Sequence, residues 1–177
     1  MRIKIFLSLL ICNIITIGCF AQNKFLDILP VKNGKANFAK VLEVDVVSQK
    51  ELYNRAKYWL INSNDLQSNM VYSDSIYDEI KSKGEVKALW GPNDYPELYL
   101  SIGYTIKLNF RNNRYKYEFT NFIVKKSGVE VQIEIYKMGN KKNKKYNTLF
   151  YQQIDEQIQI LISSLEKAMK INNKSLK

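Results

Sequence analysis

The clearest pattern in the chain is a strict alternation of apolar and polar residues between Leu100 and Phe110. This period of two is typical of a β-strand that buries one face. Asn112 and Asn113 follow, and asparagine tolerates the positive φ of a tight hairpin turn. Beyond them the alternation resumes over residues 115–119. The pattern therefore predicts two antiparallel strands joined by a two-residue turn.

A turn of two residues fixes the register of this hairpin. Apolar residues then meet apolar ones on one face and polar residues meet polar ones on the other, so a slip by one residue would destroy both matches. The alternation breaks at Asn121 and Phe122, which predicts a bulge or a strand end. The predicted pairs are Arg111 with Arg114, Phe110 with Tyr115, Leu108 with Tyr117, Ile106 with Phe119, Lys107 with Glu118, and Thr105 with Thr120.

A second pattern changes from a strand to a helix. From Leu42 to Val46, apolar residues alternate with acidic ones, as in a half-buried strand. Ser48 and Glu51 then form a capping-box pair at the start of a helix, which turn-favouring residues 62–65 should end. The helix is expected to bury Leu52, Tyr53, Ala56, Trp59 and Leu60, and to leave Glu51, Arg55 and Lys57 outside that face.

The remaining segments complete a mixed fold. Two strands are predicted between residues 69 and 90, punctuated by residues 73–75 and by Gly84, with a loop at residues 91–96. A last strand over residues 129–135 and a basic polar loop over residues 137–145 precede a long helix. Its apolar stripe consists of Phe150, Ile154, Ile158, Leu161, Ile162, Leu165 and Met169. This order predicts an α+β domain, with two amphipathic helices packed on one face of an antiparallel sheet.

The first residues have the layout of a secretory signal peptide. Arg2 and Lys4 precede an apolar run, and Ala21 ends an A-x-A-like site. Cleavage after Ala21 leaves a single domain over residues 22–172, with a frayed tail at 173–177, exported to the periplasm or secreted. The alternative takes Thr16-Ile17-Gly18-Cys19 as a lipobox, which would leave Cys19 acylated and the protein anchored to a membrane. Thr16 stands where such motifs usually carry leucine, so we prefer simple cleavage.

Composition narrows the possible chemistry. The chain has no histidine, which excludes a Ser-His-Asp triad, a Cys-His pair and a histidine-bearing zinc site. Both cysteines, Cys12 and Cys19, lie in the signal segment, so no disulfide is expected in the mature protein. Removal of Arg2 and Lys4 lowers the formal charge from +10 to +8, which still favours anionic partners. Export argues against nucleic acid as a partner, and we expect no cofactor and no metal site.

Three stretches resemble a family of secreted bacterial domains of unknown function with a TBP-like fold. They are the segment LPVKNGKANFAKVLEVD, the helix S-Q-K-E-L-Y-N-R-A-K-Y-W-L with Tyr53 and Trp59, and the hairpin IGYTIKLNFRNNRYKYEFTNF. The resemblance covers most of the mature chain. It implies a curved antiparallel sheet with helices on one face. It supplies no catalytic residues and no established ligand.

Two surfaces are candidates for binding. If both helices cover one face of the sheet, the other face is left open and polar, and it carries Lys107, Asn109, Lys116 and Glu118. The second candidate is the basic loop, with Lys141, Lys142, Lys144 and Lys145.

We therefore predict a noncatalytic binding or interaction domain of the cell envelope. Its partner would be an envelope protein or an anionic envelope polymer, and it would contact a membrane only through a lipidated Cys19. The alternative is a hydrolase that acts on polysaccharide or peptidoglycan through a pair of carboxylates about 5 to 10 Å apart.

Overall fold

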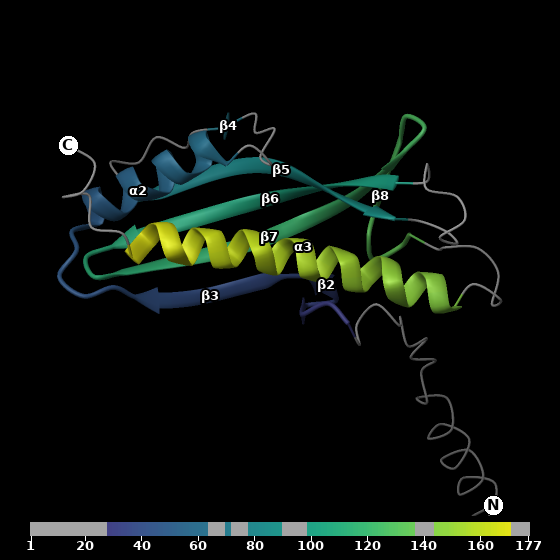
Figure 1. Cartoon of the computed structure of the whole chain (residues 1–177), viewed down its shortest axis with the longest axis horizontal. Helices are drawn as coiled ribbons and strands as arrows, with labels where there is room; N and C mark the ends of the chain where they lie inside the picture. The colour runs from purple at the N-terminus through teal and green to yellow at the C-terminus, as the bar shows by residue number, and fades with distance from the viewer. Residues whose placement is uncertain (1–27, 64–69, 72–77, 90–98, 137–143, 171–177) are drawn as a thin grey trace, which may run out of the picture.

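The computed structural model of the protein describes residues 28–63, 70–71, 78–89, 99–136 and 144–170 (Figure 1). Its main feature is a six-stranded antiparallel sheet in the order β3-β7-β6-β5-β4, with β8 also paired to β7. A two-stranded hairpin, β1 with β2, precedes it. The strands are β1 (Val31–Lys32), β2 (Lys35–Ala36), β3 (Phe38–Glu43), β4 (Met70–Val71), β5 (Glu79–Leu89), β6 (Tyr99–Arg111), β7 (Arg114–Lys126) and β8 (Val129–Gln132).

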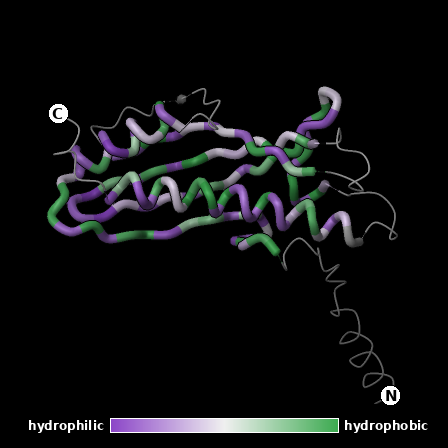
Figure 2. Tube along the Cα trace, viewed as in Figure 1, coloured by the Kyte–Doolittle hydropathy of each residue, from purple (hydrophilic) through white to green (hydrophobic). Residues whose placement is uncertain are grey.

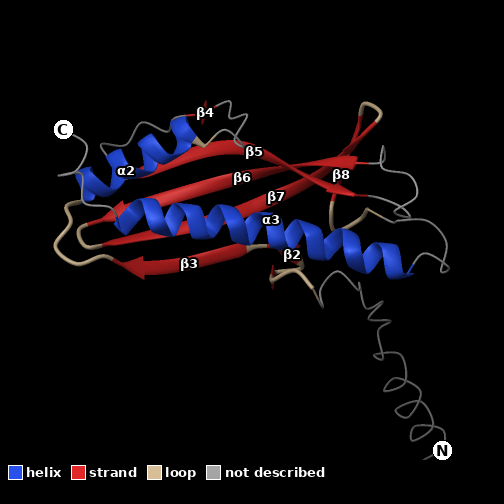
Figure 3. Ribbon diagram, viewed as in Figure 1, coloured by secondary structure: helices blue, strands red, loops and turns tan. Residues whose placement is uncertain are grey.

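Two helices, α2 (Gln49–Asn62) and α3 (Lys144–Lys170), cover one face of this sheet (Figure 3). Helix α3 packs on β5 and on α2, and α2 also contacts β5, β6 and β7. The predicted α+β architecture, an antiparallel sheet with two helices, is therefore confirmed. Of the helices in the described ranges, none is long and apolar enough to cross a membrane.

The register predicted for the β6-β7 hairpin is confirmed at every pair. Phe110 lies opposite Tyr115 and Lys107 opposite Glu118, with Asn112 and Asn113 as the turn. Asn113 has a φ of 62°, the left-handed conformation that asparagine adopts at little cost.

The predicted break at Asn121 is a β-bulge. The pairing shifts between Gly103 and Thr105, so that Tyr104 of β6 faces both Asn121 and Phe122 of β7. Asn121 adopts a φ of 53°. One extra residue on β7 reverses which positions face the helices, and Phe122 therefore lies in the core although it stands an odd number of residues after Phe119.

The core lies between the sheet and the helices. All seven residues of the predicted stripe on α3 are buried, which confirms the pattern. Figure 2 shows the alternation of hydrophobic and hydrophilic residues along the long strands and along α3. Trp59 of α2 is 5% exposed, and its indole nitrogen donates to Ser164 Oγ of α3 at 3.0 Å. Trp59 is a core residue, as predicted.

Helix α2 begins and ends where the sequence predicts. The hydroxyl of Ser48 accepts from the amide of Glu51 at 3.2 Å, and the helix ends at Asn62. The placement of Arg55 outside the buried face is wrong, since Arg55 is only 6% exposed. Its guanidinium can be buried because it has partners: Nε binds Glu51 and Nη1 donates to the carbonyl of Met169.

Other boundaries differ from the predictions. Strand β3 ends at Glu43, and Val46 lies in a turn with a φ of 51° and 96% exposure, so it is no part of a half-buried strand. Gly84 does not interrupt β5 but lies buried within it. Strand β8 ends at Gln132, because residues 133–135 form a turn that buries Ile133.

The basic loop is shorter than predicted. Lys144 and Lys145 are the first residues of α3 rather than part of the loop. Lys141 and Lys142, the signal segment at 1–21, the loop at 91–96 and the tail at 173–177 lie outside the described residues.

Candidate functional site

The face of the sheet opposite the helices carries the predicted binding residues. Side chains alternate along each strand, so the positions between the core residues of β5, β6 and β7 point away from the helices. No helix of the described part of the chain covers this face. We call it the open face, and its charged and amide residues on β5, β6 and β7 are Glu79, Lys81, Lys83, Glu85, Lys87, Lys107, Asn109, Arg111, Arg114, Lys116, Glu118 and Lys125.

The first cluster on the open face surrounds Glu79. Its carboxylate lies 2.7 Å from Lys107 Nζ and 3.2 Å from Lys81 Nζ, and it accepts from Asn109 Nδ2 at 2.9 Å. These contacts, chiefly the hydrogen bond from Lys107, lower the pKa of Glu79 to about 2 against the opposing effect of burial. The sequence did not predict that Glu79 belongs to the open face. Its position on β5, opposite Asn109, could be assigned only once β5 was paired with β6.

A second cluster surrounds Glu118. Its carboxylate accepts from Asn37 Nδ2 at 2.9 Å and from Lys116 Nζ at 3.0 Å. These bonds, the one from Asn37 first, lower the pKa of Glu118. Lys107 lies directly opposite Glu118, and Asn109 directly opposite Lys116. The structure therefore brings together all four residues predicted for this face, and it shows that both lysines already contact a carboxylate.

A third pair lies beyond the bulge. Lys125 Nζ is 2.7 Å from the carboxylate of Glu85, and this contact raises the pKa of Lys125 and lowers that of Glu85. The middle of the open face is thus a set of matched charges. Each lysine in these contacts is held in place by an acid of the same face: Glu79 and Glu118 lie on the same or the neighbouring strand, and Glu85 lies two strands away from Lys125, across β6.

At the end of the open face next to the hairpin turn, two cationic side chains lack such carboxylate partners among the described residues. Arg111 and Arg114 lie directly opposite each other and both are exposed. Within the described ranges, neither side chain makes an ion pair or a hydrogen bond. The sequence predicted their pairing but not their role, and the available signal was two like charges placed opposite each other on a sheet.

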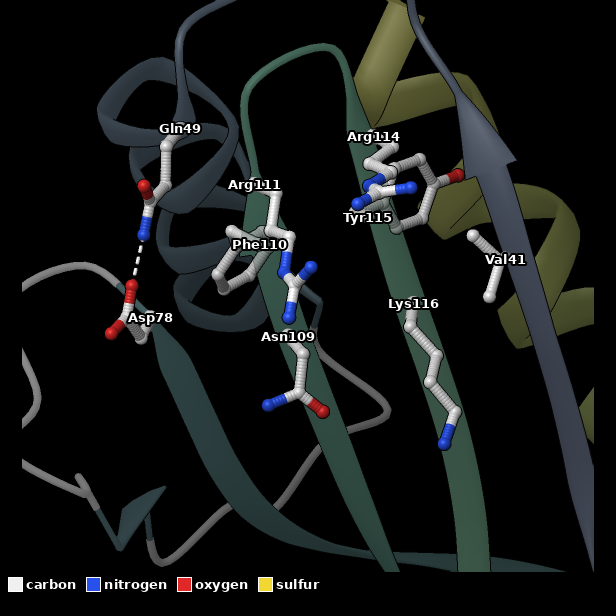
Figure 4. A pocket seen from close by; sticks show the side chains of 9 residues that line it. All are labelled: Val41, Gln49, Asp78, Asn109, Phe110, Arg111, Arg114, Tyr115 and Lys116. Atoms are coloured by element: carbon white, nitrogen blue, oxygen red, sulfur yellow. Dashed lines mark hydrogen bonds between the residues drawn. The ribbon is translucent and has the colours of Figure 1, made fainter.

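The two arginines line a pocket of about 680 Å³ (Figure 4). Its walls come from β3, from the start of α2, from Asp78 and from the end of the hairpin. Figure 4 shows Asn109 and Lys116 beside the arginines, and the side chain of Gln49 bonded to Asp78. A second hollow of about 810 Å³ shares Gln49, Arg111 and Arg114. The full lining of the first pocket is Val41, Gln49, Asp78, Asn109, Phe110, Arg111, Arg114, Tyr115 and Lys116.

The hairpin turn is fixed to the segment that leads into α2. The amide of Asn113 donates to the carbonyl of Val47, and its own carbonyl accepts from the amide of Val44, both at 2.8 Å. The side-chain oxygen of Asn113 accepts from the amide of Val47, and that of Asn112 from the amide of Gln49, both at 2.9 Å. These four bonds set the position of the arginines relative to α2.

No metal centre is visible in the residues that the structure describes, since no three acidic or sulfur side chains gather there. Two neighbouring acidic residues, Asp78 and Glu79, are bonded to other side chains: Asp78 to Gln49, and Glu79 to the lysines of its cluster.

Comparison with known proteins identifies the family. Residues 38–125 match the family model described as a domain of unknown function, DUF4468, with a TBP-like fold. The chain belongs to the DUF4468 family. A search of curated proteins finds no significant match.

Two solved structures share the DUF4468 fold. A DUF4468 family protein from Bacteroides ovatus has a TM-score of 0.63 and 17% identity, over 83% of this chain and 93% of that one. A TBP-like protein from Parabacteroides distasonis has a TM-score of 0.57 and 17% identity, over 78% of this chain and 97% of that one. At such identities the comparison establishes the fold.

Only one of the two candidate surfaces lies within the segment that matches the DUF4468 model. Every open-face residue named above lies within residues 38–125, including both arginines. The basic loop lies outside that range. The open face therefore lies within the segment that matches the DUF4468 model, and the basic loop lies outside it.

Proposed function

We propose that this DUF4468 protein is a noncatalytic binding domain of the cell envelope, which holds an anionic polymer on its open face. The observation that carries the proposal is the charge of that face. Its described residues include more cationic than acidic side chains, and such a surface attracts polyanions. The cationic residues are Lys81, Lys83, Lys87, Lys107, Arg111, Arg114, Lys116 and Lys125; the acidic residues, with those of the flanking strands β3 and β8 included, are Glu43, Glu79, Glu85, Glu118 and Glu130.

The ion pairs of the face support binding. Lys107 and Lys116 are held by Glu79 and Glu118, so they lose less freedom when a ligand arrives than free lysines would. The three long strands that carry them are paired over almost their whole length, with one bulge between β6 and β7, which makes the surface a rigid support.

The pKa values favour binding over the hydrolase alternative. A carboxyl group that acts as a general acid near neutral pH needs a raised pKa. On the open face the pKa values of Glu79, Glu85 and Glu118 are all lowered. Carboxylates that stay ionised are suited to hold lysines in place and poorly suited to donate a proton to a leaving group.

The cell-envelope location is part of the proposal and rests on the signal segment. Residues 1–21 would direct export, and Cys19 would attach the protein to a membrane only if the lipobox is used. Fractionation of cells that express the wild type and Cys19→Ala separates the two routes. Release of Cys19→Ala from the membrane fraction would indicate lipidation, and an unchanged soluble exported protein would indicate simple cleavage.

Retention on an immobilised acidic polysaccharide tests the binding proposal. We expect the variant with Lys107→Gln and Lys116→Gln to elute at lower salt than the wild type, since two charges of the face are lost. The matched control is Lys167→Gln with Lys170→Gln, which removes two exposed charges from α3, on the covered side of the sheet. Equal shifts in the two variants would show that only net charge matters, and would contradict a binding face.

A further inference from the structure

The arginine pair at the hairpin end is not explained by folding. Like charges directly opposite each other destabilise a sheet, and Arg111 and Arg114 hold that position. Within the described residues no carboxylate lies within ion-pair distance of either guanidinium. By contrast, Lys107 and Lys116 of the same face each have such a partner. In the described part of the chain, two positive charges therefore lie directly opposite each other without an ion-pair partner.

The surroundings add positive potential to this pair. Gln49 lines the pocket and is the first residue of α2, a helix of 14 residues whose N-terminus carries a partial positive charge. The amine of Lys116 contributes a further charge at the pocket wall, which its single contact with Glu118 does not exhaust, because an ammonium group has three donors.

The acidic groups near the pocket do not cancel the arginines. Asp78 lines the pocket but accepts from the side chain of Gln49. Glu43 and Asp45 line the neighbouring hollow instead. Glu43 is even paired with Arg114 in the β3-β7 ladder, yet no ion pair forms between them.

From this geometry we infer that the pocket between Arg111 and Arg114 binds a doubly charged oxyanion, of the class of phosphate monoesters. A guanidinium presents a planar fork of donors that matches phosphate oxygens. A monocarboxylate would neutralise one arginine, whereas a phosphate monoester carries close to two charges at neutral pH and neutralises both. The volume of about 680 Å³ leaves room for the group that bears the phosphate.

The inference rests on the proposed function, because the pocket belongs to the same open face, and it names the chemical group that the face recognises. Phosphate of this kind occurs on small esters and as a terminal group on larger envelope molecules. Inorganic phosphate and glycerol phosphate represent the shared chemistry. The affinity for a phosphorylated polysaccharide is then compared with the affinity for glycerol phosphate. Tighter binding of the polysaccharide would indicate a polymer as the ligand, and equal affinities would indicate a free ester.

Calorimetric titration of the purified protein with inorganic phosphate at low ionic strength tests the inference. The variant with Arg111→Gln and Arg114→Gln should raise the dissociation constant at least about tenfold. The matched control is Lys83→Gln with Lys87→Gln, which removes two exposed charges from the same face along β5, and should raise it less than about twofold. Arg111→Lys with Arg114→Lys keeps the charge without the forks and should lie between the two.

The pH dependence gives a second, independent result. The second ionisation of a phosphate monoester lies near pH 6. The chain has no histidine, the side chain that usually titrates in this range, while the charged neighbours of the arginines are Glu43, Asp45, Asp78 and Lys116. Binding of glycerol phosphate should therefore weaken as pH falls from 7.5 to 5.5, and binding of methyl sulfate, a permanent monoanion, should be weaker throughout and independent of pH over that range.

Two outcomes would overturn the inference: equal weakening of phosphate binding by the arginine and lysine variants, or no saturable binding by the wild type. Neither outcome would contradict the proposed function, which is tested by retention on acidic polysaccharide. Conversely, phosphate binding could depend on the arginines while the Lys107 and Lys116 variant elutes from the polysaccharide column at the same salt as the wild type. That combination would support the phosphate site and refute the wider binding face.

Discussion

Arg55 Nη1 of α2 donates to the backbone carbonyl of Met169 in the last turn of α3, at 2.6 Å. The last carbonyls of a helix have no partner within the helix, and a buried one must find a donor elsewhere. Arg55 supplies that donor, while its Nε binds Glu51 at 2.9 Å on its own helix. One side chain therefore caps α3 and joins the two helices.

Replacement of Arg55 by methionine should destabilise the protein by about 1.5–3 kcal/mol, the range for a hydrogen bond to a charged group. Methionine keeps much of the apolar stem, so the loss reports the polar contacts. The free energy of unfolding in urea measures the effect. Asn54→Ala, at an exposed position of the same helix, should change it by less than about 0.5 kcal/mol. A comparable loss in both variants would mean that general helix propensity, and not the contact with Met169, is responsible.

Loss of the Trp59 side chain should cost more. Trp59→Ala removes a large aromatic group from the core and should lower the free energy of unfolding by about 3–5 kcal/mol. Trp59→Phe keeps most of the packing and loses the bond to Ser164, so it should cost less than Trp59→Ala. Tyr58→Ala is the control, because Tyr58 is exposed on the same helix. A denaturation midpoint unmoved by Trp59→Ala would contradict the core assignment.

Acid should lower the free energy of unfolding, because it protonates the carboxylates that hold the clusters of the open face together. The folded pKa of Glu79 is about 2, below its ordinary value of 4.5, so its stabilising effect is complete above the ordinary value and is lost as pH falls toward 2. Glu85 and Glu118 act in the same direction. We expect the unfolding free energy of the wild type to fall more steeply across this window than that of Glu79→Gln.

The control for this comparison is Glu156→Gln, at an exposed position on α3 with no ion pair to the described residues. Urea titrations at a series of pH values should give it the slope of the wild type. If Glu79→Gln also keeps that slope, the contacts with Lys107 and Asn109 do not persist in solution.

The arginine pair should cost the protein stability when no anion is present. Arg114→Thr removes the repulsion across the hairpin and should raise the free energy of unfolding by about 0.2–1 kcal/mol at low ionic strength. Added sodium chloride should reduce the gain, because salt screens exposed charges. A loss of stability in Arg114→Thr would instead assign the arginine a structural role.

The sequence was most informative where one local rule was sufficient. Two asparagines and an unbroken alternation determine the β6-β7 register, since turn length and hydrophobic match leave a single solution. The bulge at Asn121 was visible as a change of parity. Glu118 and Lys107 were placed together for the same reason.

Features that depend on distant segments could not be predicted in this way. Arg55 is buried only because the last turn of α3 ends above it, far along the chain. The sequence also gave no way to pair Glu79 with Lys107, since that contact needs the order of β5 and β6 in the sheet. The pocket beside Arg111 and Arg114 likewise requires β3 and α2 to close around the hairpin end.

The four hydrogen bonds between the hairpin turn and the segment ahead of α2 connect the arginine pair with both helices. Asn112 and Asn113, which follow Arg111, bond to the segment at the start of α2. Arg55 of α2 in turn bonds to the end of α3. If a ligand is held by the arginines, as proposed, it would therefore also restrain the start of α2 and the end of α3.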